Sequence, residues 1–101
     1  MNNWKTPKLK KLVQAFLSLR SQPEMMSFLR DLCTAEELEE LSTRWEVAKM
    51  LEKGMPYRQI AMSTKTSTTT VARIAFWLEH GEGGYRVALK KEKKQLSTGG
   101  I

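Results

Sequence analysis

The amino-acid sequence predicts an all-α protein. Apolar residues recur every three or four positions through most of the chain, which is the spacing of amphipathic helices. Capping residues, glycines and prolines divide the chain into six such segments, and the strict alternation of a half-buried strand is absent. The chain has 101 residues, enough for one domain of ordinary size, which we expect to span residues 1–94.

The charge of the chain favours an anionic partner. Its 17 basic and 11 acidic side chains give a formal charge of +6, which suits nucleic acid, an anionic membrane surface or an acidic protein. The distribution is uneven, because residues 34–53 carry six acidic and three basic side chains, whereas residues 1–33 carry two acidic and six basic ones. We expect the acidic segment to lie away from any polyanion.

The first two predicted helices are amphipathic. The first spans residues 8–20 and begins near Thr6-Pro7, because proline is tolerated in the first turn of a helix. The second spans residues 23–32. Their apolar stripes comprise Leu9, Leu12, Val13, Phe16 and Leu17 in the first helix, and Met25, Phe28, Leu29 and Leu32 in the second. Each stripe needs an apolar surface to cover it.

The third predicted helix begins after Thr34 and ends before Gly54. Thr34-Ala35-Glu36-Glu37 matches a capping box, in which the threonine hydroxyl and the Glu37 carboxylate each accept a hydrogen bond from a free backbone N–H. Gly54 followed by Pro56 is the expected order of stop signals. The glutamates suit the positive end of the helix dipole, and they lack the histidines of a metal site. The apolar stripe comprises Leu38, Leu41, Trp45, Ala48 and Leu51.

The sequence offers little for catalysis or metal binding. Cys33 is the only cysteine and His80 the only histidine, so we expect neither a disulfide nor a metal site. No nucleophile with an adjacent base and no phosphate-binding loop is recognisable, and we expect neither enzyme activity nor a required cofactor. No apolar run is long enough for a bilayer and no signal peptide is evident, which predicts a cytoplasmic protein without a membrane partner.

Residues 56–78 have the pattern of a helix-turn-helix. Two short helices are predicted, over residues 56–63 and 67–80, and Ala61 is small enough for them to cross closely. The apolar residues spaced to lock the pair are Ile60, Val71 and Ile74. Such a motif places the start of its second helix in the major groove of DNA, with backbone N–H groups near phosphates.

The second helix of this motif begins with small polar side chains. Hydroxyls can bind phosphates, and threonine methyls can contact the thymine methyl. The predicted DNA-binding residues are Ser67, Thr68, Thr69, Thr70 and Arg73, with Arg58, Gln59 and Lys65 at the phosphate backbone. Lys65 occupies a turn position that favours glycine, and left-handed backbone there costs a lysine about 1 kcal/mol.

Two other interpretations of these residues remain open. A polar helix start can serve for capping alone. A helix-turn-helix can also bind a protein instead of DNA, since a fold does not fix a function. A protein-interaction module without operator binding is therefore the alternative to a DNA-binding protein.

The end of the chain is predicted to form one short helix and a tail. Gly81-Glu82-Gly83-Gly84 breaks the chain before a last helix over about residues 85–92. Residues 95–101 have no apolar pattern, and we expect them to form a loose tail.

Residues 32–78 resemble the bacterial Trp repressor family. The resemblance is carried by Leu32-Cys33-Thr34-Ala35-Glu36, by Leu41-Ser42-Thr43-Arg44, and by a helix-turn-helix with Thr70 and Arg73. Gly83-Gly84-Tyr85 resembles the uncharacterised Trp-repressor-related members rather than the Trp repressor itself. The family implies a six-helix subunit, an entwined homodimer, and a transcriptional repressor whose two reading helices, about 34 Å apart, bind a palindromic operator.

The resemblance also implies a corepressor pocket beside the reading helix. In the Trp repressor two arginines hold L-tryptophan, and arginine pairs suit a carboxylate. The matching positions are Arg44 and Arg73 for the arginines, and Thr34 and Thr70 for neighbours of the ligand. Where the Trp repressor has a glycine and a serine, this chain has Ile74 and Trp77. We therefore expect these two side chains to fill the pocket, L-tryptophan not to be the effector, and a smaller anionic ligand to be the alternative.

Overall fold

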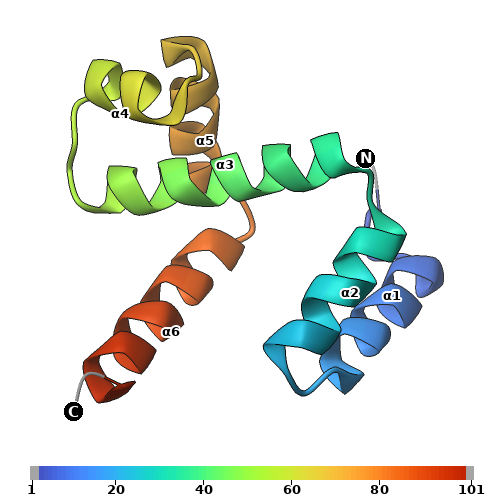
Figure 1. Ribbon diagram of the computed structural model, residues 1–101. Helices are drawn as coiled ribbons and strands as arrows, with labels where there is room; N and C mark the ends of the chain where they lie inside the picture. Colours follow the sequence, from blue (N-terminus) through green and yellow to red (C-terminus); the bar gives the residue numbers. More distant parts are fainter. Residues whose placement is uncertain (1–2, 100–101) are drawn as a thin grey trace. The chain divides into compact units, whose positions relative to one another are not determined.

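The computed structural model describes residues 3–99 and contains six α-helices (Figure 1). They are α1 (Pro7–Ser18), α2 (Gln22–Leu32), α3 (Ala35–Glu52), α4 (Tyr57–Thr64), α5 (Thr68–His80) and α6 (Gly84–Gly99). No strand occurs among the described residues. The predicted all-α class and the predicted order of helices are confirmed. None of the helices in the described part of the chain is both long and apolar enough to span a bilayer.

The chain divides into two compact units, Met1–Glu39 and Glu40–Ile101. The sequence predicted one domain over residues 1–94, whereas the division falls inside α3. Each unit is described by itself below.

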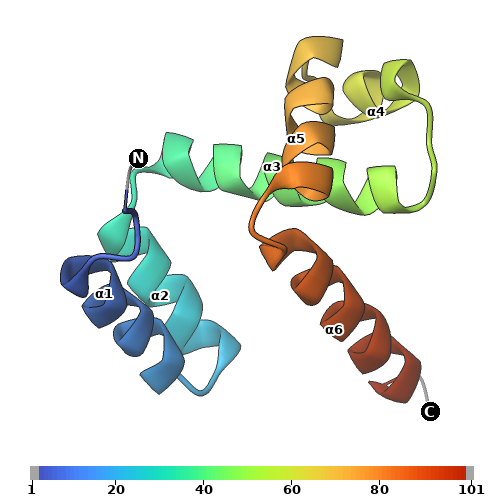
Figure 2. The same ribbon diagram turned by 180° about the vertical axis from the view of Figure 1, so that it is seen from behind.

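The first unit contains a helical hairpin without a closed core. Helices α1 and α2 lie side by side (Figures 1 and 2), and the rings of Phe16 and Phe28 meet edge to face with their centroids 5.2 Å apart. None of its described residues is fully buried. The side chains of Leu17 and Leu32, one from each apolar stripe, are 78% and 48% exposed, and Met26 outside the stripes is 62% exposed. Two helices have too little surface to cover both of their apolar stripes.

The predicted capping box at the start of α3 is confirmed. The backbone N–H of Glu37 donates to the Thr34 hydroxyl over 3.1 Å, and the backbone N–H of Thr34 donates to the Glu37 carboxylate over 2.8 Å. At the other end Gly54 has φ +80°, a left-handed conformation that glycine adopts without steric cost. The backbone N–H of Gly54 donates to the Leu51 carbonyl over 3.0 Å, which ends the helix.

The second unit is built on a core shared by α3, α4 and α5. The buried side chains of this core come in pairs, one pair from each helix. They are Val47 and Ala48, Ile60 and Ala61, and Val71 and Ile74. The three apolar residues predicted to lock the helix-turn-helix therefore do so, with Ala61 buried at the crossing. The sequence did not single out Val47, although its side chain is completely inaccessible to solvent.

Helix α6 is longer than predicted. It continues to Gly99 instead of ending near Glu92, so residues 95–99 of the expected loose tail are helical, and residues 100–101 lie outside the described part. The segment after Tyr85 is rich in lysine, glutamate, glutamine and leucine, which propagate a helix well. Glu92 lies 3.5 Å from the Lys49 ammonium of α3, and Leu89 is buried. The apolar pattern predicted Leu89 as a contact of this helix, but it did not indicate the ion pair between Lys49 and Glu92.

We predict that Ile60→Ala lowers the free energy of unfolding by about 2–5 kcal/mol, because it leaves a cavity among α3, α4 and α5. Met62→Ala on the same helix should change it by less than about 0.5 kcal/mol, since Met62 is 80% exposed. Urea denaturation at one fixed protein concentration measures both. Equal reductions for the two variants would show that the α4 core contacts are wrongly placed.

Candidate nucleic-acid interface

The turn of the helix-turn-helix has the conformation that the sequence predicted. Lys65 has φ +57° and ψ +42°, and it is the only non-glycine residue with positive φ among those described. The backbone N–H groups of Lys65 and Thr66 both donate to the Ala61 carbonyl, the second over 3.0 Å. The reversal between α4 and α5 is therefore closed by backbone hydrogen bonds, and the lysine adopts the left-handed backbone that usually needs glycine.

In the polar start of α5, residues 67–70, two residues are joined by hydrogen bonds of the helix cap and two make no side-chain hydrogen bond in the described part of the chain. The Ser67 hydroxyl accepts a hydrogen bond from the Thr70 backbone N–H over 3.1 Å, and the hydroxyls of Ser67 and Thr70 are also 3.1 Å apart. Thr68 and Thr69 are exposed and have no side-chain hydrogen bond within the described part of the chain. The capping interpretation thus holds for Ser67, while Thr68 and Thr69 present their side chains to solvent.

The electrostatics of this region favour an anion. Residues 54–78 contain no acidic side chain. The first turn of α5 therefore has no carboxylate that would neutralise the positive end of the helix dipole. The four predicted contacts Arg58, Gln59, Lys65 and Arg73 are all exposed. Within the described residues none of the three cations among them forms an ion pair. They are therefore available to phosphates without breaking an existing pair.

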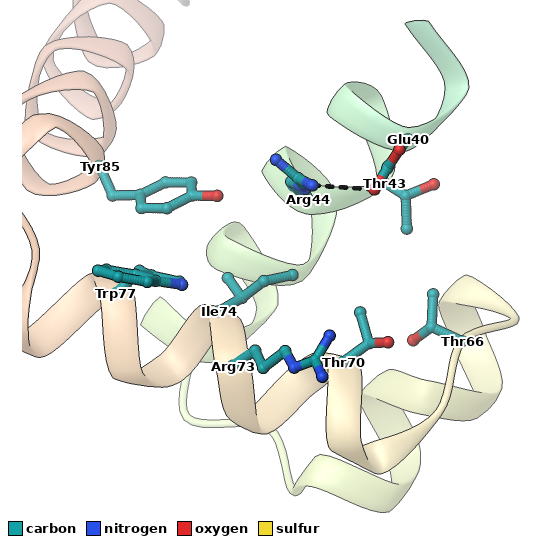
Figure 3. Close-up of a pocket in the computed structure, with 9 residues that line it drawn as sticks. All are labelled: Glu40, Thr43, Arg44, Thr66, Thr70, Arg73, Ile74, Trp77 and Tyr85. Carbon is teal, nitrogen blue, oxygen red and sulfur yellow. Dashed lines mark hydrogen bonds and ion pairs between the residues drawn. The ribbon is translucent and has the colours of Figure 1, made fainter. Parts of the chain in front are cut away.

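A hollow of about 720 Å³ lies beside α5 (Figure 3). We call it the arginine hollow. It is lined by Glu40, Thr43, Arg44, Thr66, Thr70, Arg73, Ile74, Trp77 and Tyr85. Arg44 on α3 and Arg73 on α5 lie on opposite walls, threonines occupy one end, and the rings of Trp77 and Tyr85 occupy the other. The Arg44 guanidinium is paired with the Glu40 carboxylate at 2.9 Å.

The hollow gathers most of the predicted effector residues. Arg44, Arg73 and Thr70 line it together, as the resemblance implied. Thr34 is not among its lining residues, and its hydroxyl caps α3. Ile74 is 4% exposed and is part of the core, whereas Trp77 is 57% exposed. The ring of Trp77 lies at one end of the hollow near Tyr85 (Figure 3), and the expectation that it fills the corepressor pocket stays a prediction.

Four lining residues were not predicted to belong to the hollow, namely Glu40, Thr43, Thr66 and Tyr85. Glu40 precedes Arg44 by four positions, the spacing at which opposite charges pair on a helix surface, so this contact was readable from the sequence. Tyr85 reaches the hollow because the chain turns at Gly83, which has φ +83°. No local pattern indicated that turn's direction.

The comparisons with known proteins agree with this geometry. The family of the Trp repressor protein matches residues 7–93. The uncharacterised protein YerC of Bacillus subtilis (strain 168) is 38% identical over 86 residues, which are 85% of this chain and 83% of that protein. A TrpR-like protein from Eubacterium eligens ATCC 27750 has a similar crystal structure, with a TM-score of 0.84 and 39% identity over 88% of this chain and 92% of that one.

A Trp repressor candidate from Staphylococcus aureus is also similar, with a TM-score of 0.83 and 34% identity over 88% of this chain and 89% of that one. These matches cover all the helices around the arginine hollow and the helix-turn-helix. The chain belongs to the Trp repressor family, in the uncharacterised branch that includes YerC rather than with the Trp repressor itself.

Proposed function

We propose that this protein is a sequence-specific regulator of transcription, a repressor, that binds a palindromic operator in double-stranded DNA. The observation that carries the proposal is the start of α5. There a helix N-terminus, two exposed threonines and the exposed Arg73 occur in a segment without acidic side chains. Thr68 and Thr69 would contact base edges, and the cations would contact phosphates. Such a protein works in the cytoplasm, where the bacterial chromosome lies.

The protein is proposed to act as a homodimer. The first unit leaves Leu17 and Met26 largely exposed, and none of its described residues is fully buried. A second copy would supply the apolar surface that these side chains need, because burial of apolar area favours association. Two-fold symmetry then presents two copies of α5 and explains the expectation of a palindrome.

The arginine hollow is proposed to take a small anionic effector. Arg44 and Arg73 face one another across it, and a carboxylate or phosphate would bring both guanidiniums into charge-assisted hydrogen bonds. Its volume is sufficient for an amino acid. We keep the expectation that L-tryptophan is not the effector, because Ile74 and Trp77 are larger than the glycine and the serine that the Trp repressor has at these positions. DNA binding itself is proposed to need no cofactor.

A protein-interaction module is the second candidate function. Tyr57 on α4 and Phe76 on α5 favour it, because they are exposed and line one surface hollow, and exposed apolar clusters often mark protein interfaces. DNA-binding measurements separate the two candidates, because a module of this kind would show no salt-dependent affinity for duplex DNA.

We predict that Thr69→Ala and Arg73→Ala each weaken binding to a DNA sequence selected from a random pool. Removal of a base contact should cost about 1–3 kcal/mol, which is about 5- to 150-fold in affinity. Fluorescence anisotropy at several salt concentrations measures this. Lys53→Ala, which removes a positive charge at the end of the acidic segment, is the control and should bind like wild type. Equal binding by all four proteins would contradict the proposal.

We predict that Ser67→Ala and Thr69→Ala separate capping from DNA recognition. Ser67→Ala should lower the free energy of unfolding by about 1 kcal/mol, since it removes the N-cap hydrogen bond of α5. Thr69→Ala should leave stability within about 0.5 kcal/mol, because its side chain has no hydrogen bond in the described structure. Thermal denaturation measures both. If Thr69→Ala lowered the stability as much as Ser67→Ala, its weaker DNA binding would be explained by unfolding of the protein and not by a lost base contact.

We predict that inorganic phosphate binds the arginine hollow and that L-tryptophan does not. Isothermal titration calorimetry should detect phosphate binding to wild type and its absence in Arg73→Ala and Arg44→Ala, because each removes one of the two cations. Arg58→Ala, which lies outside the hollow, is the matched control and should bind phosphate normally. Saturable heat with L-tryptophan that disappears in Arg73→Ala would overturn the expectation about the effector.

A further inference from the structure

The turn between α4 and α5 contains a pair of threonine hydroxyls that has no role in the proposed function. The Thr64 hydroxyl donates to the Ile60 carbonyl over 2.8 Å, and the hydroxyl oxygens of Thr64 and Thr66 are 3.0 Å apart. A hydroxyl has one proton to donate. Since the Thr64 proton is committed to Ile60, Thr66 must be the donor to Thr64. The chain of hydrogen bonds therefore runs in one direction, from Thr66 to Thr64 to the backbone of α4.

The two threonines of this hydroxyl pair directly precede and follow Lys65 in the sequence. Thr64 and Thr66 are half-buried, and Thr66 is additionally held by its backbone N–H, which donates to the Ala61 carbonyl over 3.0 Å. Lys65 lies between them in left-handed backbone. A lysine has a steric cost in this conformation, and such strain persists only where the surroundings over-determine it. The hydroxyl pair adds to the constraint that the backbone hydrogen bonds of Lys65 and Thr66 to Ala61 provide.

The side chain of Lys65 is exposed at the end of the turn that leads into α5. It forms no hydrogen bond or ion pair with other described residues. The direction of a Cα–Cβ bond depends on φ and ψ, so a turn relaxed to right-handed backbone would point the ammonium elsewhere. Glycine would suit the backbone better but would carry no charge. The turn is thus less stable than a glycine turn would be, and its backbone sets the direction in which the Lys65 side chain leaves the turn beside the polar start of α5.

We infer that Thr64 and Thr66 are positioning residues, which hold Lys65 in left-handed backbone so that its ammonium meets a DNA phosphate next to the reading helix. This inference rests on the proposed function, because it needs bound DNA. It goes beyond that function in assigning the hydroxyl pair a role in affinity, and in explaining why a residue that strains the turn is tolerated there.

Five proteins test the inference: wild type, Lys65→Gly, Thr66→Val, Thr66→Ser and the double variant Lys65→Gly/Thr66→Val. Fluorescence anisotropy on the selected operator at several salt concentrations gives the affinity and its salt slope, and thermal denaturation gives stability. Lys53→Ala is the matched charge control. If Thr66→Val does not fold, Thr66→Ala removes the same hydroxyl without the added branch.

Lys65→Gly should raise the unfolding temperature, weaken operator binding, and reduce the salt slope by about 0.9 for each phosphate that the protein no longer neutralises. Thr66→Val should reduce the slope in the same way while lowering the unfolding temperature. Thr66→Ser should have the salt slope and the unfolding temperature of wild type, because serine keeps the hydroxyl. In the Lys65→Gly background, Thr66→Val should produce no further change in slope, since the charge that it positions is already absent.

Two results would overturn the inference alone. An unchanged slope in Lys65→Gly would mean that Lys65 meets no phosphate. A slope that falls in Lys65→Gly but not in Thr66→Val would mean that the hydroxyl pair supports only the fold. Absence of salt-dependent DNA binding by wild type would instead overturn the proposed function together with this inference, so the two failures are distinguishable.

Discussion

The packing of α5 against α3 and α4 is the constraint on which the rest of the second unit depends. Val71 and Ile74 lie one turn apart on α5 and are buried against Val47 and Ala48 of α3 and against Ile60 and Ala61 of α4. Ala61 allows the close crossing, because a larger side chain would separate the two helices of the motif. Once this face of α5 is buried, the directions of its other side chains follow from helical geometry.

Each face of α5 therefore has a different role. Thr70, Arg73 and Trp77 recur at helical spacing beside the buried face and line the arginine hollow. Thr68 and Thr69 lie at the start of the helix, where the backbone N–H groups are free and the dipole is positive. An anion in the hollow and a DNA molecule at the start of α5 would both contact this one helix. Thr66 also lines the hollow, and the hydroxyls of Ser67, Thr64 and Thr66 hold the turn and the helix start in place.

The first unit has the opposite physical problem. Its two helices are well capped, because the Thr6 and Ser21 hydroxyls accept backbone N–H groups at their starts. Local hydrogen bonds define where these helices begin, but they do not cover an apolar face. Leu17 and Met26 remain largely exposed in a single chain. Solvation of that face is the physical reason to expect a second copy, and it is independent of the chemistry of the helix-turn-helix.

The sequence by itself determined what depends on neighbours in the chain. Helix starts, the capping box at Thr34, the left-handed Lys65 and the lock formed by Ile60, Val71 and Ile74 all follow from spacing and side-chain chemistry. Only the tertiary structure decided which way Trp77 points, how Tyr85 reaches the hollow after Gly83, and how Lys49 and Glu92 link α3 to α6. These contacts join residues distant in sequence, and local periodicity carries no information about the direction in which a packed side chain leaves its helix.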